Sequence, residues 1–273
     1  MKSPSFNQYG VLEQCVNTTE IDHATEELVR LGYTVLSANF SHETIEHLAH
    51  TFDTTLDNYR NRFGVKQLKE KDEFNTIRLP LSHHPLFIGL ATHPLLLELI
   101  DKLIYGKYIL NQQNGIINPP NERYNQDAWH RDLPYQHFVS DRPIIINALY
   151  CVDEFTLENG ATYVLPGSHK YSSFPSNEYI SKNSIQICAP AGSFIILDGM
   201  LYHRGSKNNT KHARRAINHV YTIPHIKQQI SIPNALGPVS LDVAVQELFG
   251  YPFRSPNTVV EFIADRPPKS ISL

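Results

Sequence analysis

Apolar residues recur at every third or fourth position through much of the first hundred residues, which predicts amphipathic helices. One helix is expected over residues 20–31, because a glycine follows it as a typical helix stop. A second begins after Ser41, a residue type that caps helix N-termini, and a third covers residues 95–104. Residues 33–36 are β-branched and aromatic and predict a short strand. The amino-terminal part, about 18–106, is therefore expected to be mostly helical.

The pattern changes near residue 107 to short apolar or alternating runs separated by Gly, Pro, Asn and Asp clusters. Many short strands without intervening helices indicate an antiparallel sandwich or barrel rather than a parallel α/β sheet. The β core is expected over about 107–224, and a carboxy-terminal part, 225–273, holds one helix at 241–249 and a tail. No linker separates these parts, so residues 1–273 are expected to form one domain. Strands are expected at 108–117, 144–152, 184–188, 193–197 and 216–223.

Composition narrows the classes of partner. Hydrophobic residues make up 41% of the chain, and the formal net charge of −3 gives no reason to expect nucleic acid or an anionic membrane surface. Apolar runs long enough for a membrane span or a signal peptide are lacking, and the end reads Ile-Ser-Leu rather than the peroxisomal Ser-Lys-Leu. We expect a cytoplasmic monomer or weak homodimer that acts on a small molecule, with neither nucleic acid nor membrane as partner. The three cysteines are expected to be buried small hydrophobes.

A candidate metal site begins in the segment Trp-His-Arg-Asp at 129–132. His130 and Asp132 are two positions apart, so on extended backbone both side chains point to one face and reach one ion. Alone the pair is a weak signal, because a surface ion pair or a capped turn would also explain it. His203, just past the apolar run 193–198, is the best third ligand. Two histidines and a carboxylate leave three coordination positions open, which suits Fe(II) that also holds a co-substrate and oxygen.

Arg214 lies eleven residues beyond His203, at the entrance to the strand expected at 216–223. A guanidinium there can clamp a dicarboxylate bidentately, as the distal carboxylate of 2-oxoglutarate requires. A solvated surface charge is the alternative if Arg214 is considered alone. Arg215 is expected to point to the opposite face as a solvated charge.

Together these residues resemble the phytanoyl-CoA dioxygenase family, which includes ectoine hydroxylase. The matching elements span residues 107–223, and the order of the blocks between the two ligand segments makes the match specific. Gly160 and Gly167 in these blocks are expected to adopt positive φ. The blocks are Pro-Pro at 119–120, Glu-Asn-Gly-Ala at 158–161, Val-Leu-Pro-Gly-Ser-His-Lys at 164–170 and His-Arg-Gly-Ser-Lys-Asn-Asn-Thr at 203–210.

The resemblance implies a mainly β fold with flanking helices, built on a double-stranded β-helix or jelly roll of the cupin type. It implies that His130, Asp132 and His203 are the catalytic Fe(II) ligands, and that Arg214 anchors 2-oxoglutarate. Halogenating relatives replace the carboxylate ligand with a small residue, so Asp132 favours hydroxylation. The implied reaction uses O2 to hydroxylate an aliphatic carbon of a small metabolite or biosynthetic intermediate, releasing succinate and CO2.

Further contacts follow from the same resemblance. Gln113, or its rival Asn111 with another gap placement, corresponds to a family position that contacts 2-oxoglutarate. Family members often carry a serine two residues after the second histidine ligand, which corresponds to His203 here. In this chain that position is Gly205, and Ser206 follows it.

Substrate contacts are expected at the mouth of the β core. Arg78 could reach over this mouth and bind an anionic group. Tyr135, Gln136 and His137 follow the ligand segment and could line the same mouth. A surface or packing role is equally open for each of these residues.

Two other functions remain open on the same residues: a zinc-dependent hydrolase that uses the same three ligands, and a catalytically inactive β-sandwich binding module. His-Arg-Asp-Leu at 130–133 also looks like a protein-kinase catalytic loop. That interpretation is rejected, because the sequence has neither a Gly-rich phosphate loop near its start nor Asp-Phe-Gly. His169 is expected to be a loop residue rather than a ligand.

Overall fold

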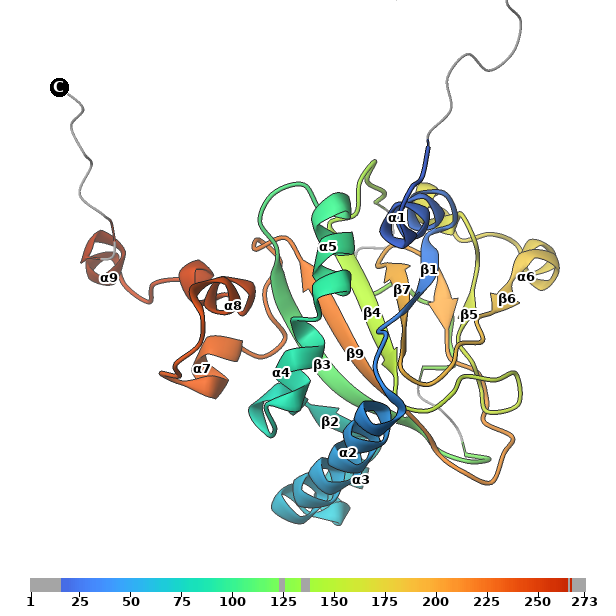
Figure 1. Ribbon diagram of the computed structural model, residues 1–273, viewed down its shortest axis with the longest axis horizontal. Coiled ribbons are helices and arrows are strands. Elements are labelled where there is room, and N and C mark those ends of the chain that lie inside the picture. Colours follow the sequence, from blue (N-terminus) through green and yellow to red (C-terminus); the bar gives the residue numbers. More distant parts are fainter. Residues whose placement is uncertain (1–15, 123–125, 134–137, 265, 267–273) are drawn as a thin grey trace, which may run out of the picture.

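The computed structural model describes residues 16–122, 126–133, 138–264 and 266, and Figure 1 shows their arrangement. The helices are α1 (Glu20–Leu31), α2 (His42–Phe63), α3 (Val65–Glu70), η1 (Pro80–Ser82), α4 (Leu86–Ala91), α5 (Pro94–Leu103), η2 (Ser168–Lys170), α6 (Asn177–Asn183), α7 (Ile232–Leu236), α8 (Val243–Leu248), η3 (Tyr251–Phe253) and α9 (Val259–Ala264). The strands are β1 (Tyr33–Ser37), β2 (Thr76–Arg78), β3 (Ile109–Asn118), β4 (Ile145–Cys151), β5 (Tyr163–Val164), β6 (Ile185–Gln186), β7 (Ser193–Asp198), β8 (His203–Arg204) and β9 (Arg214–Thr222).

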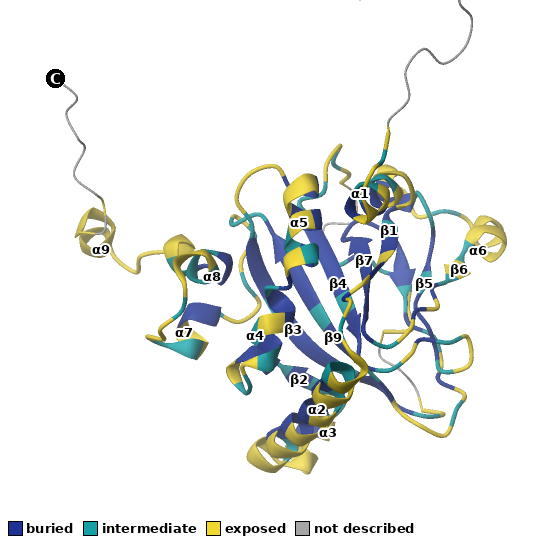
Figure 2. Cartoon of the chain, viewed as in Figure 1, coloured by how far each residue is buried: buried dark blue, intermediate teal, exposed yellow. Residues whose placement is uncertain are grey.

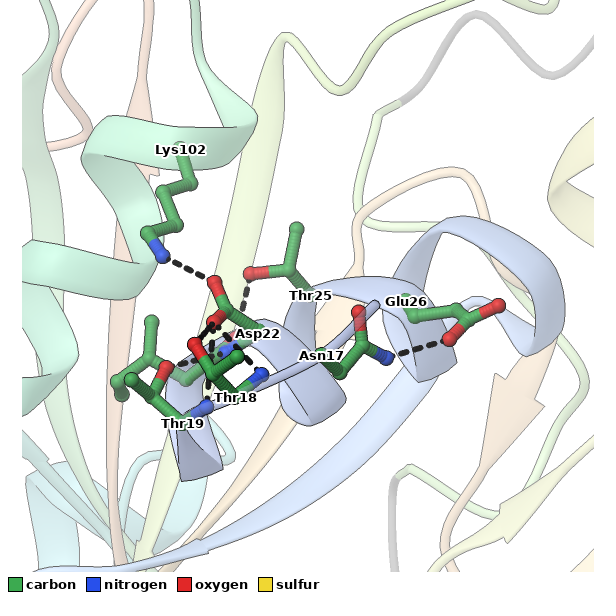
Figure 3. Close-up of polar contacts among 8 residues, drawn as sticks. Asn17, Thr18, Thr19, Asp22, Thr25, Glu26 and Lys102 are labelled. Carbon is green, nitrogen blue, oxygen red and sulfur yellow. Dashed lines mark hydrogen bonds and ion pairs between the residues drawn. The ribbon is translucent and has the colours of Figure 1, made fainter. Parts of the chain in front are cut away.

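Helix α1 has the bounds that its periodicity predicts, and Figure 3 shows what fixes its start. The Thr19 hydroxyl accepts a hydrogen bond from the Asp22 amide at 3.1 Å, while the Asp22 carboxylate accepts one from the Thr19 amide at 3.2 Å. The same carboxylate pairs with Lys102 at 2.6 Å, which ties α1 to α5. Gly32 ends the helix at φ 85°. This local agreement explains why the helix could be predicted to the residue.

The strands form two antiparallel sheets. The larger has the order β1-β7-β4-β9-β3-β2, and the smaller has the order β6-β5-β8. Strands β4 and β7, with the sequences IINALYC and SFIILD, are buried almost throughout because both faces of the larger sheet are covered. The predicted antiparallel core is thus confirmed. The strand expected at 184–188 is shorter, and the one expected at 216–223 begins two residues earlier, at Arg214.

Alternate residues of the larger sheet enter two different cores. Phe194, Ile217 and Tyr221 pack under α1, α2, α4 and α5, on what we call the helix face (Figure 1). Ile195 and Ala216 point the other way and pack with residues of the smaller sheet, on what we call the pocket face. Figure 2 shows the consequence, since the central strands of the larger sheet are largely buried and the helices that cover it expose their outer sides.

Outside these cores, α9 projects from the body, and all its residues are exposed (Figure 2). No helix within the described residues is long and apolar enough to cross a bilayer. Cys151 is buried as predicted, but Cys188 is exposed. Its neighbours Ile187 and Ala189 are buried, and the alternation of the extended chain therefore turns Cys188 outward. Cys15 lies outside the described residues.

Candidate metal centre

Three side chains meet on the pocket face at the end of the sheets. The ligand atoms of His130, Asp132 and His203 all lie within 4.8 Å of one another. The His203 Nε2 lies 3.7 Å from the Asp132 Oδ1, and the two imidazole centroids are 4.3 Å apart. These three residues line a cavity of about 70 Å³ together with Arg214. The predicted triad is therefore assembled in space, from segments more than seventy residues apart.

Backbone hydrogen bonds hold the two ligand segments side by side. The His130 amide donates to the His203 carbonyl at 2.9 Å, and the His203 amide donates back at 3.0 Å. The Asp132 amide donates to the Gly199 carbonyl at 3.0 Å, in the turn that leads from β7 to β8. The relative positions of the three side chains are thus set by main chain rather than by flexible side-chain contacts.

Each ligand is also oriented by its second polar atom. The Nδ1 of His130 bonds the Ala128 carbonyl at 2.8 Å, and the Nδ1 of His203 bonds the Leu201 carbonyl at 3.0 Å. Both rings therefore turn Nε2 toward the carboxylate. The Asn147 amide donates to Asp132 Oδ2 at 2.9 Å, which leaves Oδ1 facing the histidines. Sequence reasoning missed Asn147, because it lies on β4 with no motif around it.

The protonation state and the spacing of the three side chains also suit a metal ion. Burial, and the neighbouring His203, lower the pKa of His130 below its ordinary value. The neutral imidazole, which is the form that binds metal, is therefore favoured. Ligand bonds of about 2.1 Å place neighbouring ligand atoms about 3 to 3.6 Å apart, close to the separation observed between His203 and Asp132. The donor set, two imidazoles and one carboxylate, suits Fe(II) and also Zn²⁺.

Arg214 begins β9 and points into the same cavity. It is 2% exposed, its guanidinium lies 4.0 Å over the Phe155 ring, and it donates a hydrogen bond to the Gly160 carbonyl. Gly160 has φ 83°, and a Cβ there would clash with the Ser206 carbonyl oxygen, so this close approach requires glycine. Gly167 also has positive φ, as predicted. Arg214 is thus a buried cation at the cavity, not a solvated surface charge.

Two residues predicted to contact the co-substrate, Gln113 and Asn111, form hydrogen bonds within the protein instead. The Gln113 carbonyl accepts from the Leu81 amide, and its amide donates to the Phe87 carbonyl, both at 2.7 Å. Gln113 therefore lies on the helix face, with the sheet between it and the triad. Asn111 sits at the irregularity in β3 and donates to the carbonyls of Ile226 and Lys227. The motif alignment could not show which way either side chain points.

Ser206, the serine that follows His203 most closely, does not occupy the position of the family's serine. Gly205 lines the cavity, while the Ser206 carbonyl accepts a hydrogen bond from Asn118 at 2.8 Å. Ser206 is absent from the cavity lining among the described residues. The hydroxyl that does line it belongs to Thr162, which the sequence gave no reason to choose.

The remaining predicted residues lie elsewhere. Arg78 binds Glu73 through two hydrogen bonds of 2.8 and 2.6 Å and lies beside a different cavity, so its charge is already satisfied by a carboxylate. Arg215 points to the opposite face from Arg214, as predicted, but it pairs with Asp153 and Asp53 rather than with solvent alone. The residues at 134–137, which include Tyr135, Gln136 and His137, lie outside the described residues.

The Leu-Pro-Gly-Ser-His block supports the site without entering it. The Ser168 hydroxyl accepts from the Tyr202 amide at 2.9 Å, beside His203, and its carbonyl accepts from Arg131 at 3.0 Å. The block therefore joins the two ligand segments. His169 is buried against α1, where its Nε2 bonds the Val29 carbonyl at 3.2 Å, so it is a structural residue, as expected.

Comparison with known sequences agrees with this geometry. The family model for phytanoyl-CoA dioxygenase (PhyH) matches residues 28–216. An uncharacterized protein of Mycobacterium tuberculosis is 29% identical over 226 residues, covering 81% of this chain and 82% of that protein. The dioxygenase af480 of Aspergillus fumigatus is 28% identical over 147 residues, covering 50% of this chain and 45% of that protein.

Solved structures share the fold. EctD from S. alaskensis, crystallised with 2-oxoglutarate and 5-hydroxyectoine, superposes with a TM-score of 0.64 at 20% identity, covering 78% of this chain and 80% of that one. The epimerase SnoN, in complex with Fe³⁺, alpha ketoglutarate and nogalamycin RO, superposes with a TM-score of 0.57 at 16% identity, covering 81% of this chain and 92% of that one. The antiparallel sheets with flanking helices are therefore an arrangement shared with iron and 2-oxoglutarate oxygenases.

Proposed function

Because the chain belongs to the phytanoyl-CoA dioxygenase family, we propose that it is an Fe(II)- and 2-oxoglutarate-dependent dioxygenase that hydroxylates an aliphatic carbon of a small molecule. The observation that supports this best is the meeting of His130, Asp132 and His203 in one cavity with the buried cation Arg214. We further propose that residues 1–273 form one domain, in which the two sheets make the double-stranded β-helix of the family.

The residues divide into two roles. His130, Asp132 and His203 bind Fe(II), and the carbonyl groups of Ala128 and Leu201 together with Asn147 keep the three ligand atoms turned toward it. Arg214 binds the distal carboxylate of 2-oxoglutarate, because burial strengthens its attraction for an anion. The bound iron supplies the oxidative decarboxylation of 2-oxoglutarate and the oxidation of the substrate by O2.

The cavity lining supports this reaction over zinc-dependent hydrolysis. A hydrolase of this type needs a general base beside the metal-bound water. Among the described residues that line the cavity, the histidines and carboxylates are the three ligands themselves, and the other charged residue is Arg214. A cation opposite the ligands fits an anionic co-substrate and does not fit a base.

The test is turnover with defined metals. We expect the purified protein with Fe(II), O2 and 2-oxoglutarate to release succinate and CO2 in equal amounts, and the Zn²⁺-loaded protein to release neither. Equal turnover with Zn²⁺, or turnover without 2-oxoglutarate, would overturn the proposal.

Arg214 is tested by a matched pair of variants. Arg214→Ala should raise the KM for 2-oxoglutarate at least about tenfold, because it removes a charge-assisted hydrogen bond to the co-substrate. Arg215→Ala should lower stability, since it breaks the pairs with Asp153 and Asp53, and leave this KM unchanged. An unchanged KM in Arg214→Ala would remove that residue from its role.

A further inference from the structure

Three asparagines on adjacent strands form a row on the pocket face. Asn147 is on β4, Asn218 on β9 and Asn114 on β3. Asn218 is paired directly with Asn114 on one side and with Leu149 on the other, while Asn147 is paired with Val220, one diagonal step away. Asn147 and Asn218 line the cavity that holds the triad. We call Asn147, Asn218 and Asn114 the asparagine row.

The orientation of the first amide is fixed by its partner. The Asp132 carboxylate accepts hydrogen bonds, so the Asn147 atom 2.9 Å from it is the Nδ2 donor. The Asn147 Oδ1 therefore points away from Asp132.

The orientation of the last amide is fixed through a chain of contacts. Arg78, held by Glu73, donates to Gln229 at 3.2 Å, so the Gln229 atom there is an oxygen. The same oxygen accepts from Asn114 at 3.3 Å, so Asn114 directs Nδ2 toward Gln229. This leaves the Asn114 Oδ1 as an acceptor on the pocket face.

All three acceptors lack a partner within the part of the chain that the structure describes. The Oδ1 atoms of Asn147, Asn218 and Asn114 are buried, and none accepts a hydrogen bond from the described residues. Buried acceptors without a donor are unfavourable, and these three lie close together on adjacent strands, where one bound molecule can supply donors to them. Asn111, on the same strand as Asn114, shows the ordinary case, because its amide bonds two backbone carbonyls.

The row lies away from the proposed co-substrate anchor. Asn218 is four residues along β9 from Arg214 and on the same face, about 13 Å away at 3.3 Å per residue. The pocket face therefore has a cationic end at Arg214 and, farther along the sheet, an acceptor end at the asparagine row, where Asn147 contacts the triad through Asp132. Ionised 2-oxoglutarate carries acceptor oxygens and no hydrogen-bond donor, so it cannot satisfy the row, which is left for the molecule that is oxidised.

We infer that the asparagine row recognises the substrate, and that the substrate presents N–H or O–H donors to it as hydroxyl or ammonium groups. This inference rests on the proposed function, because it takes the triad as the reacting centre. Carbonyl oxygens repel carboxylates and phosphates, so the row excludes anionic groups from this end. Since Glu73 already holds the Arg78 guanidinium, Arg78 serves to orient the row and does not bind an anion.

The first test needs no ligand. Asn218→Leu should keep or raise the midpoint of thermal unfolding, because it removes a buried acceptor that the fold itself does not use. Asn111→Leu is the matched control and should lower the midpoint, because it leaves two backbone carbonyls without a donor. If Asn218→Leu lowers the midpoint as much as Asn111→Leu does, the row is a structural feature and the inference fails.

The second test uses three probes that differ only in their polar group: cyclohexylammonium, cyclohexanol and cyclohexanecarboxylate. Their binding to the Zn²⁺- and 2-oxoglutarate-loaded protein is measured by ligand-observed NMR. The ammonium or the alcohol should bind at least about tenfold more tightly than the carboxylate, the factor expected for a single good hydrogen bond to a buried acceptor. The tighter of the two identifies whether the substrate offers N–H or O–H groups.

Variants of Asn218 then test whether the asparagine row causes the preference for the ammonium or the alcohol over the carboxylate. Asn218→Leu should reduce it to within about threefold, and Asn218→Asp should raise the ammonium affinity relative to the alcohol by about tenfold. Tighter binding of the carboxylate to the wild type, an unaltered ranking in Asn218→Leu, or no probe binding to a protein that does bind metal and 2-oxoglutarate overturns the inference alone. A wild type that binds neither metal nor 2-oxoglutarate overturns the proposed function instead.

Discussion

Gln113 and Asn114 are adjacent on β3 and lie on opposite faces of the larger sheet. Gln113 uses both ends of its amide within the protein, with the Leu81 amide and the Phe87 carbonyl. Asn114 donates once, to Gln229, and leaves its carbonyl without a partner among the described residues. Gln113 is thus satisfied within the protein, whereas Asn114 and the metal ligands on the pocket face keep polar atoms for molecules that bind there. We expect substitutions on the helix face to change stability, and those on the pocket face to change binding.

The largest expected effect separates two buried histidines. His203→Ala should abolish iron binding and lower turnover by at least about 10⁴-fold, roughly 5.5 kcal/mol, while the protein stays folded. His93 is its counterpart on the helix face, where its Nε2 bonds the Ala38 carbonyl at 3.1 Å. His93→Ala should lower stability and retain one iron per chain. Iron analysis and thermal unfolding of both variants test this, and full iron content in His203→Ala would remove the distinction between the faces.

A second effect concerns the helix-face core. Phe194 is fully buried and contacts the rings of His93, Tyr150 and His219. Phe194→Ala should cost about 3–5 kcal/mol of unfolding free energy, measured by urea denaturation, because it leaves a cavity. Leu149 is half-buried and lines the existing cavity. Leu149→Ala should lower the unfolding free energy by less than about 2 kcal/mol, since less packing is lost. Equal costs would show that both faces are packed alike.

Lowering the pH should destabilise the protein through His219, which is buried on the helix face. Burial lowers the pKa of His219 to about 4, so the unfolded chain, with an ordinary pKa of about 6.5, binds this proton more readily. The free energy of unfolding should therefore fall as the pH decreases from about 6.5 to about 4, by about 2 kcal/mol between pH 7 and pH 5 from this residue. His219→Gln should remove that part of the pH dependence. Identical pH profiles of wild type and variant, from urea denaturation, would contradict the prediction.

The smallest expected effect concerns Gln113, which bonds groups of the helix face. Gln113→Leu should cost about 1–3 kcal/mol of unfolding free energy, because a backbone amide and a carbonyl lose their partner. Its KM for 2-oxoglutarate should stay within about twofold of wild type, since the sheet separates Gln113 from the triad. A rise in KM comparable to that of Arg214→Ala, without loss of stability, would return Gln113 to the site.

Local patterns predicted the elements, and motif order predicted the triad. The bounds of α1 could be predicted because its caps and periodicity are local, and His130, Asp132 and His203 because their blocks occur in a specific order. The face of Gln113 could not be predicted, because an irregularity in β3 near Asn111 shifts the alternation. The asparagine row was equally hidden, since Asn114 and Asn218 become neighbours only through strand pairing.

The most direct test of this account is to locate the metal and the co-substrate in crystals grown without oxygen in the presence of Fe(II) and 2-oxoglutarate. Anomalous scattering at the iron edge should show one peak, about 2 Å from the Nε2 atoms of His130 and His203 and from the Asp132 Oδ1. The distal carboxylate of 2-oxoglutarate should contact Arg214, with the asparagine row left free. An iron peak away from these three side chains, or a co-substrate carboxylate on the asparagine row, would contradict the assignment of the two ends of the pocket.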